Sequence, residues 1–374
     1  MAEYGSVISV FVFANIIVTL FELGFGNYFQ RKTASDKNNL SEEVNSALAF
    51  RAIAYLIVIT SSILYFPKDI NSIVTAVIIV SAIFLFSTNW VLIKIFYGLD
   101  QYRFVFYRFL ISRVVLIVGV VVSIWLNVSL SVIMTSFLVS SILEFSLLFR
   151  QMFRMKLIEF RIDLSVEVLK RILIYSVPMG LSVFFVMVYD RIDVLLIQRI
   201  ISTEAVSYYA VAYSLYKIPS IFTPIVLTPL FSDLSSEFEI TKRIYLSKIK
   251  NLLLLLVAFA IISIIIIYFF ADIIIGITYG ENYLASTDLL IVLALALPFL
   301  FLNNLTGTTL NSIKKERFVF YSTIIGAGIN ILLNIILLNT IGIKGAVVTT
   351  IVSEFLVFFI QVNYLMKLRK PIFK

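Results

Sequence analysis

Residues 251–270 read NLLLLLVAFAIISIIIIYFF, an apolar run that carries no charged side chain. About 20 helical residues cross a hydrocarbon layer of about 30 Å, so this run indicates a transmembrane helix. The whole chain has the same character, because 61% of its 374 residues are hydrophobic, 14% are charged and the mean hydropathy is +1.04. Such a composition excludes a soluble core with a polar shell. The sequence therefore predicts an all-α polytopic membrane protein.

About 11 apolar segments, each about as long as a membrane-spanning helix, follow one another along the chain. They divide into five before a charged, amphipathic connection and six after it, which predicts two lobes around a central cavity. The expected organisation is an N-terminal lobe at 1–149, a cytoplasmic linker on the membrane surface at 150–171 and a C-terminal lobe at 172–374. The predicted spans are 5–27, 47–66, 73–97, 105–126, 128–149, 172–200, 206–230, 250–270, 286–309, 319–338 and 345–366.

The basic residues between these spans predict the orientation of the chain. On one side the loops carry many more Lys and Arg residues than on the other, where only Lys68 and Lys344 lie. Cytoplasmic loops carry this excess, so the C-terminus is expected in the cytoplasm and the N-terminus outside a plasma membrane. The cationic side holds Arg31, Lys32, Lys37, Arg103, Arg150, Arg154, Lys156, Arg161, Lys170, Arg171, Lys242, Arg243, Lys248, Lys250, Lys314, Lys315, Arg317, Lys367, Arg369, Lys370 and Lys374.

The start of the chain and its residue types narrow the function classes. No positive stretch precedes the first apolar run, which argues against a cleaved signal peptide and predicts that this run stays in the membrane. An external N-terminus at the head of five spans is typical of a lobe whose first helix is missing. The chain has no His and no Cys. We therefore expect no metal, no cofactor and no enzymatic activity.

Charged residues within the spans mark the candidate sites, since a charge at mid-bilayer costs about 2.5 to 3.5 kcal/mol on insertion scales. Arg113 and Lys217 lie deepest and predict a cationic, substrate-binding cavity. The sequence YDRID (189–193) places Asp190, Arg191 and Asp193 within about one helical turn of each other, either lining that cavity or forming a cluster at the membrane interface. No arrangement of this kind points to nucleic-acid binding.

Two further acids and two proline sites complete the set. Glu354, in the middle of the last span, and Glu22, near a cytoplasmic span end, are candidates for ion coupling or for polar contacts between helices. Pro178 with Gly180, and Pro298 in the ninth span, predict bends in their helices.

Four stretches carry a resemblance to a known family: Glu3–Ala34 (EYGSVISVFVFANIIVTLFELGFGNYFQRKTA), Tyr175–Pro219, YGENYLAS (279–286) and Asn330–Glu354. In their order and spacing they resemble the polysaccharide-export family of flippases, which shares a superfamily with multidrug and toxic compound extrusion proteins. That resemblance implies twelve or fourteen spans, transport by alternating access and an acidic-Tyr-Gly stretch after span one. Here Glu3-Tyr4-Gly5 begins the chain, so span one is expected to be absent.

The resemblance implies that the chain moves lipid-linked oligosaccharide or polysaccharide repeat units, as in O-antigen and lipopolysaccharide synthesis. Its implied partners are a polyisoprenoid-linked oligosaccharide, membrane lipids, a polysaccharide polymerase and glycosyltransferases. Two alternatives stay open: a cation-coupled exporter of drug-like compounds, and a truncated family member that does not transport. A membrane glycosyltransferase is disfavoured because the predicted external loops are too short for a catalytic domain.

Overall fold

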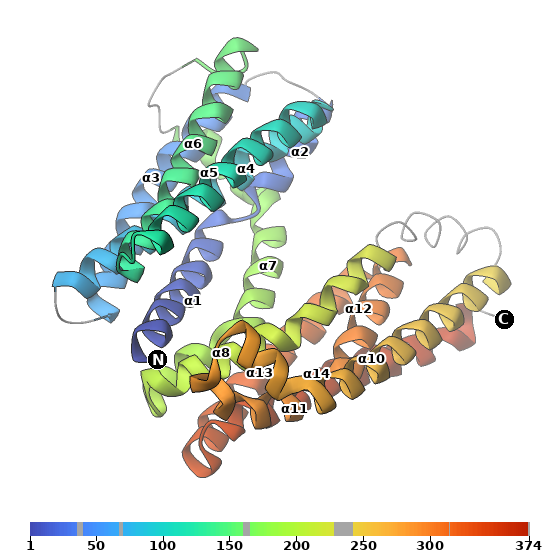
Figure 1. Ribbon diagram of the computed structural model, residues 1–374. Coiled ribbons are helices and arrows are strands. Elements are labelled where there is room, and N and C mark those ends of the chain that lie inside the picture. Colours follow the sequence, from blue (N-terminus) through green and yellow to red (C-terminus); the bar gives the residue numbers. More distant parts are fainter. Residues whose placement is uncertain (36–39, 67–69, 160–164, 228–241, 314, 373–374) are drawn as a thin grey trace. The chain divides into compact units, whose positions relative to one another are not determined.

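A computed structural model describes residues 1–35, 40–66, 70–159, 165–227, 242–313 and 315–372. In these ranges all regular secondary structure is helical (Figure 1), which confirms the all-α prediction. Some predicted features lie outside the described residues: Lys37, Lys68, Arg161, Lys314, Lys374, the end of the 206–230 span and the centre of the 150–171 linker.

Membrane-length helices dominate the described part of the chain. Ten are long and apolar enough to cross a membrane, and the pair Glu281–Ala294 and Leu297–Ser312, which bends by 47° at a short break, makes an eleventh if it is counted as one span. Pro298 lies in the first turn after that break. A proline is tolerated there, because the backbone N–H groups of a first turn have no intrahelical partner in any case. The predicted number of spans and the predicted bend in the ninth are both confirmed.

The helices form two compact units. The N-terminal unit comprises Val10–Met187, and the C-terminal unit comprises Met1–Ser9 together with Val188–Lys374. The boundaries therefore fall inside two long helices, α1 (Ala2–Glu22) and α7 (Val166–Ile200), rather than in a loop. The predicted lobes at 1–149 and 172–374 and their linker stay a proposal.

The N-terminal unit is a bundle in which α6 packs on both α4 and α5, and α4 also packs on α2 and α3 (Figure 1). Near α2 its core holds Phe25, Phe29 and Phe96 at 1% exposure or less. Besides its parts of α1 and α7, it contains α2 (Phe25–Ser35), α3 (Leu40–Tyr65), α4 (Ile70–Gly98), α5 (Tyr102–Trp125) and α6 (Leu130–Arg154).

The C-terminal unit packs α14 against both α12 and α13, and α10 against α11 and α12. It contains α8 (Thr203–Lys217), η1 (Ile218–Ile221), α10 (Lys242–Thr278), η2 (Glu281–Ser286), α11 (Thr287–Ala294), α12 (Leu297–Ser312), α13 (Glu316–Ile341) and α14 (Lys344–Ile372).

A close backbone contact fixes the first half of α7 within the N-terminal unit. The chain turns between α1 and α2 at Leu23 (φ 50°) and Gly24 (φ 72°). A Cβ on Gly24 would lie 2.5 Å from the Ser176 carbonyl oxygen, and a Cβ on Gly180 would lie 2.6 Å from the Gly24 nitrogen. Only glycine allows this approach. Pro178, inside α7, therefore lies between the two residues, Ser176 and Gly180, that meet this turn.

Candidate functional site

The carboxylate of Asp190 is the centre of a charged cluster in the C-terminal unit. Its Oδ1 lies 2.5 Å from Lys217 Nζ, and its Oδ2 lies 3.0 Å from Arg191 Nε. The hydroxyl of Tyr213 donates to Oδ1 at 2.8 Å. Both cations also lie 5.3 Å from the centre of the Tyr213 ring. One acid thus compensates two cations, and an aromatic face supports both.

A second acid, Asp193, lies on the same helix and is 2% exposed. Its Oδ2 accepts hydrogen bonds from Tyr209 at 2.6 Å and Thr350 at 3.3 Å, and its Oδ1 accepts one from Asn334 at 2.7 Å. These donors come from α8, α14 and α13. Asp193 therefore joins four helices, and no cation pairs with it among the described residues.

The third acid, Glu354 of α14, is 4% exposed. Asn303 of α12 donates to its Oε2 at 2.6 Å and to its main-chain oxygen at 2.9 Å. Tyr189 is close enough to Glu354 and Asp193 to interact with both electrostatically. Asp190, Asp193 and Glu354 each accept hydrogen bonds from neighbouring helices, and together they make up the polar region of an otherwise apolar unit.

One charged site of the N-terminal unit is built around Arg51 and Glu22. Arg51 of α3 is 1% exposed and bonds to neutral groups, with Nε donating to Thr88 at 3.0 Å and Nη2 donating to Ser87 at 3.1 Å. Ser87 in turn donates to Glu22 at 3.1 Å. Glu22 therefore meets Arg51 through a hydroxyl rather than through a direct ion pair within the described residues.

Arg108 of α5 and Glu144 of α6 form a buried ion pair, and each side chain is at most 3% exposed. Arg113, further along α5, has no hydrogen bond or ion pair among the described residues. Its guanidinium instead lies 5.0 Å from the centre of the Phe109 ring and 5.5 Å from that of Phe86.

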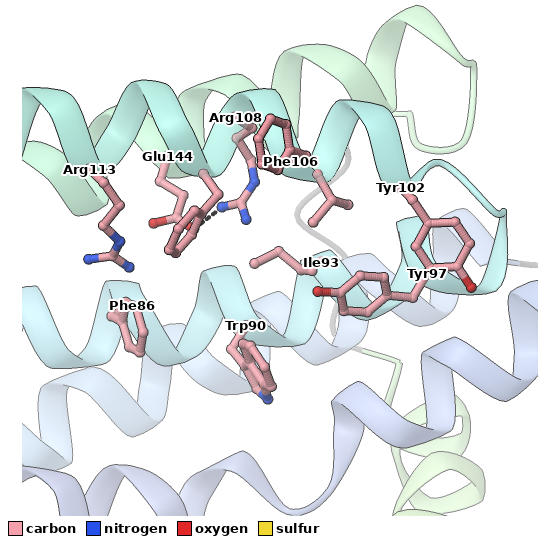
Figure 2. Close-up of a pocket in the computed structure, with 11 residues that line it drawn as sticks. Phe86, Trp90, Ile93, Tyr97, Tyr102, Phe106, Arg108, Arg113 and Glu144 are labelled. Carbon is pink, nitrogen blue, oxygen red and sulfur yellow. Dashed lines mark ion pairs between the residues drawn. The ribbon is translucent and has the colours of Figure 1, made fainter. Parts of the chain in front are cut away.

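These three charged side chains line a crevice of about 380 Å³ between α4, α5 and α6. Figure 2 shows Arg113, Glu144 and Arg108 on one wall, with Phe86 and Trp90 opposite and Tyr97 and Tyr102 at one end. The guanidinium of Arg113 points toward Phe86 across the opening. The crevice thus combines aromatic walls with a net positive charge.

A fourth charged site, on Glu43, was not among the sequence predictions. This side chain of α3 is 2% exposed, lies 3.2 Å from Arg171 of α7 and 3.8 Å from Lys32 of α2, and accepts a hydrogen bond from Tyr28 at 3.1 Å. Burial beside this carboxylate raises the pKa of Tyr28 to about 12, so its hydroxyl stays a donor at neutral pH. The site joins three helix ends.

The structure brings Asp190, Arg191 and Lys217 together, with Asp193 on the same helix but in a separate set of contacts. Arg113 belongs to the other unit and is not placed relative to them. The sequence analysis missed the donors to the acids, namely Tyr209, Tyr213, Asn303, Asn334 and Thr350. A signal for two of them exists in the sequence, because Tyr209 and Tyr213 are four residues apart and share a face of α8.

Comparisons with known proteins bear on the family and the fold. A family model described as "Polysaccharide biosynthesis protein" matches residues 1–288. The protein named "Probable low-salt glycan biosynthesis flippase Agl15", from Haloferax volcanii, is 27% identical over 185 residues, which are 48% of this chain and 38% of that protein. Two further curated relatives are covered over 20% and 47% of their length, so this chain spans less than half of each.

Solved structures with the same fold include two transporters. An inward-facing multidrug resistance MATE family transporter of the MOP superfamily has a TM-score of 0.73 at 16% identity, with 98% of this chain and 90% of that chain covered. The lipid II flippase MurJ, in an inward closed conformation, has a TM-score of 0.69 at 18% identity, with 98% and 85% covered.

Proposed function

This chain belongs to the polysaccharide biosynthesis protein family, and from that premise we propose that it is a flippase for lipid-linked oligosaccharides. Its substrate would be a saccharide repeat unit on a polyisoprenoid phosphate, moved across the plasma membrane by alternating access. The observation that carries the proposal is the ion-paired cluster on α7 and α8, where Asp190 bridges Arg191 and Lys217. Its position in apolar helices supports a role in transport.

In this proposal Lys217 and Arg191 attract the phosphate of the substrate, and Asp190 holds both cations when no substrate is present. An arriving phosphate competes with the Asp190 carboxylate for Lys217, which changes the contact between α7 and α8. Asp193 is expected to line the cavity beside them. Arg113 is a proposed substrate contact within the N-terminal unit.

Transport of a labelled lipid-linked oligosaccharide into reconstituted vesicles tests this function. We expect Asp190→Asn to reduce the initial rate by about tenfold, because Lys217 and Arg191 lose the carboxylate that positions them. Glu281→Gln is the matched control, since it makes the same chemical change at an exposed acid of the C-terminal unit. A normal rate in Asp190→Asn would contradict the proposed role of the cluster.

A second candidate function is cation-coupled export of small amphipathic compounds. The C-terminal unit favours it in one respect, because its polar region holds three acids, Asp190, Asp193 and Glu354, against two cations. Glu354 and Glu22 would then couple transport to an ion, whereas in the flippase proposal they serve as polar contacts between helices. Vesicles loaded with a cationic dye distinguish the two, since a flippase leaves dye efflux unchanged.

The proposed direction of transport depends on orientation. We expect reporters fused after Lys156, Lys248 and Lys315 to be cytoplasmic, because the loops on that side carry the excess of basic residues. A reporter fused after Tyr283 should be external. A cytoplasmic signal from the Tyr283 fusion would reverse the proposed topology.

A further inference from the structure

The aromatic crevice of the N-terminal unit contains a positive charge that the described residues do not compensate. Arg108 and Arg113 contribute two cations, and Glu144 contributes one acid, which is paired with Arg108. In addition, Nε of Arg108 is buried and has no hydrogen-bond partner. The crevice therefore has both an excess charge and an unused donor.

Arg113 cannot obtain compensation from water at a helix end. At 1.5 Å per residue it lies about 16 Å along α5 from Tyr102 and about 18 Å from Trp125. An arginine side chain near a helix end can reach the interface, but one at the centre of a spanning helix cannot. A cation at that depth is stable only beside an anion, a polar group or water in a cavity.

The walls of the crevice define what kind of anion fits. Phe86, Trp90, Phe106 and Phe109 present aromatic surface, which accepts a hydrocarbon chain better than a free hydrated ion. A guanidinium binds phosphate oxygens in a bidentate geometry. The volume of about 380 Å³ is in the range of pockets that hold small ligands.

The crevice also has a route of entry along the helices. It extends from Tyr97 and Tyr102, beside the turn between α4 and α5, to Phe86 and Arg113 near the middle of both helices. A lipid phosphate in the leaflet at that turn would meet Tyr97 and Tyr102 first. Beyond them, the paired Arg108 and then Arg113 lie progressively deeper.

We propose that this crevice binds the phosphate-bearing end of the polyisoprenoid carrier, with the phosphate on Arg113 and Arg108 and the first isoprene units against the aromatic walls. This inference rests on the proposed function for the identity of the lipid. It assigns a phosphate site to the N-terminal unit, and this site shares no residue with the Asp190 cluster. A phosphate on Arg113 lies at mid-membrane depth, a position that a lipid phosphate occupies only while it crosses.

The two tryptophans of the chain, Trp90 and Trp125, allow a direct binding test. Because Trp90 lines the crevice, a Trp125→Phe background makes it the single fluorescent reporter. The full chain in this background, purified in neutral detergent, is titrated with a short polyprenyl phosphate, the matching polyprenol, and phosphatidic acid. We expect the phosphate to change Trp90 emission with at least tenfold higher affinity than either of the other two lipids.

Substitution of Arg113 then tests the assignment to the guanidinium. Arg113→Gln should weaken polyprenyl phosphate binding by about tenfold or more, Arg113→Lys should weaken it less, and Arg150→Gln, at the exposed end of α6, should leave it unchanged. Thermal unfolding of each variant identifies any that fail to fold, and Arg113→Lys retains the charge if Arg113→Gln does not fold.

The inference is overturned by any of these results: no Trp90 response to polyprenyl phosphate, equal affinity for the uncharged polyprenol, or undiminished affinity in both Arg113 variants. Equal affinity for phosphatidic acid would also overturn it, since the site would then select any anionic lipid. Binding is measured without transport. A chain that binds the phosphate lipid but fails to move it would therefore contradict the proposed function and leave the crevice assignment intact.

Discussion

The ion pair of Arg108 and Glu144 in the N-terminal unit has no third charged partner among the described residues, whereas the Asp190 cluster in the C-terminal unit shares one carboxylate between two cations. Arg108 and Glu144 pair with each other, while Arg51 bonds to hydroxyl groups. By contrast, Asp190 compensates two cations at once, and Tyr213 contacts all three charged groups.

This difference gives the two sites different physical roles. An isolated ion pair stabilises one helix contact, and losing it affects that contact alone. In a shared network, moving one side chain leaves others without partners, so a local change spreads to several helices. The donors to Asp190, Asp193 and Glu354 come from α8, α12, α13 and α14, so a change at these acids reaches several helices of the C-terminal unit.

The largest expected effect on stability comes from breaking the ion pair of Arg108 and Glu144. Arg108→Met should lower the free energy of unfolding by about 3 to 5 kcal/mol, because Glu144 is left buried without a partner. The double variant Arg108→Met with Glu144→Leu should recover most of that loss, since neither charge remains. Titration with a denaturing detergent measures both.

Arg150→Met serves as the control, because it removes an exposed arginine at the end of α6. Its effect should stay within about 0.5 kcal/mol, the usual size for a surface substitution. If the double variant were as unstable as Arg108→Met, the pair would not be an isolated site and the contrast between the two sites would fail.

The apolar runs were sufficient to predict the class and the number of spans, because membrane length and backbone hydrogen bonding restrict the possible structures so strongly. The bend in the ninth span was predicted from Pro298 itself. The cost of burying charge also identified Asp190 and Lys217 as candidates. It could not pair them, since Lys217 meets Asp190 only through the rotation of α8 against α7, which local sequence does not define.

Other features depended on contacts between distant segments. The division inside α1 and α7 follows from packing such as Gly24 on Gly180, and both glycines read individually as ordinary helix residues or bends. The Glu43 site was missed because Lys32, Glu43 and Arg171 lie at predicted span ends, where charges are expected in any case. Only the structure shows that they meet.

A smaller effect is expected in the energetic coupling between pairs of substitutions, which tests whether the two sites are independent. In a double-mutant cycle, Asp190→Asn and Lys217→Met should be non-additive by about 0.5 to 3 kcal/mol, as for residues in direct contact. The same Asp190→Asn combined with Arg108→Met should be additive within about 0.5 kcal/mol, because those residues share no partner. Coupling of equal size in both cycles would mean that the Asp190 cluster and the Arg108–Glu144 pair are not energetically separate sites.

The smallest expected effect is a difference in labelling rate between two neighbouring acids. The side chain of Asp190 is 26% exposed, whereas Asp193 is 2% exposed and is enclosed by Tyr209, Asn334 and Thr350.

Since the chain has no native cysteine, single variants Asp190→Cys and Asp193→Cys can each be treated with a membrane-impermeant thiol reagent. We expect position 190 to react several-fold faster, and substrate to slow its reaction if the bound phosphate covers the position beside Lys217. Labelling at 190 that ignores substrate would favour an interfacial cluster over a cavity. Faster labelling at 193 would show instead that the network opens around Asp193 during the transport cycle, which would move the responsive contact from α8 to α13 and α14.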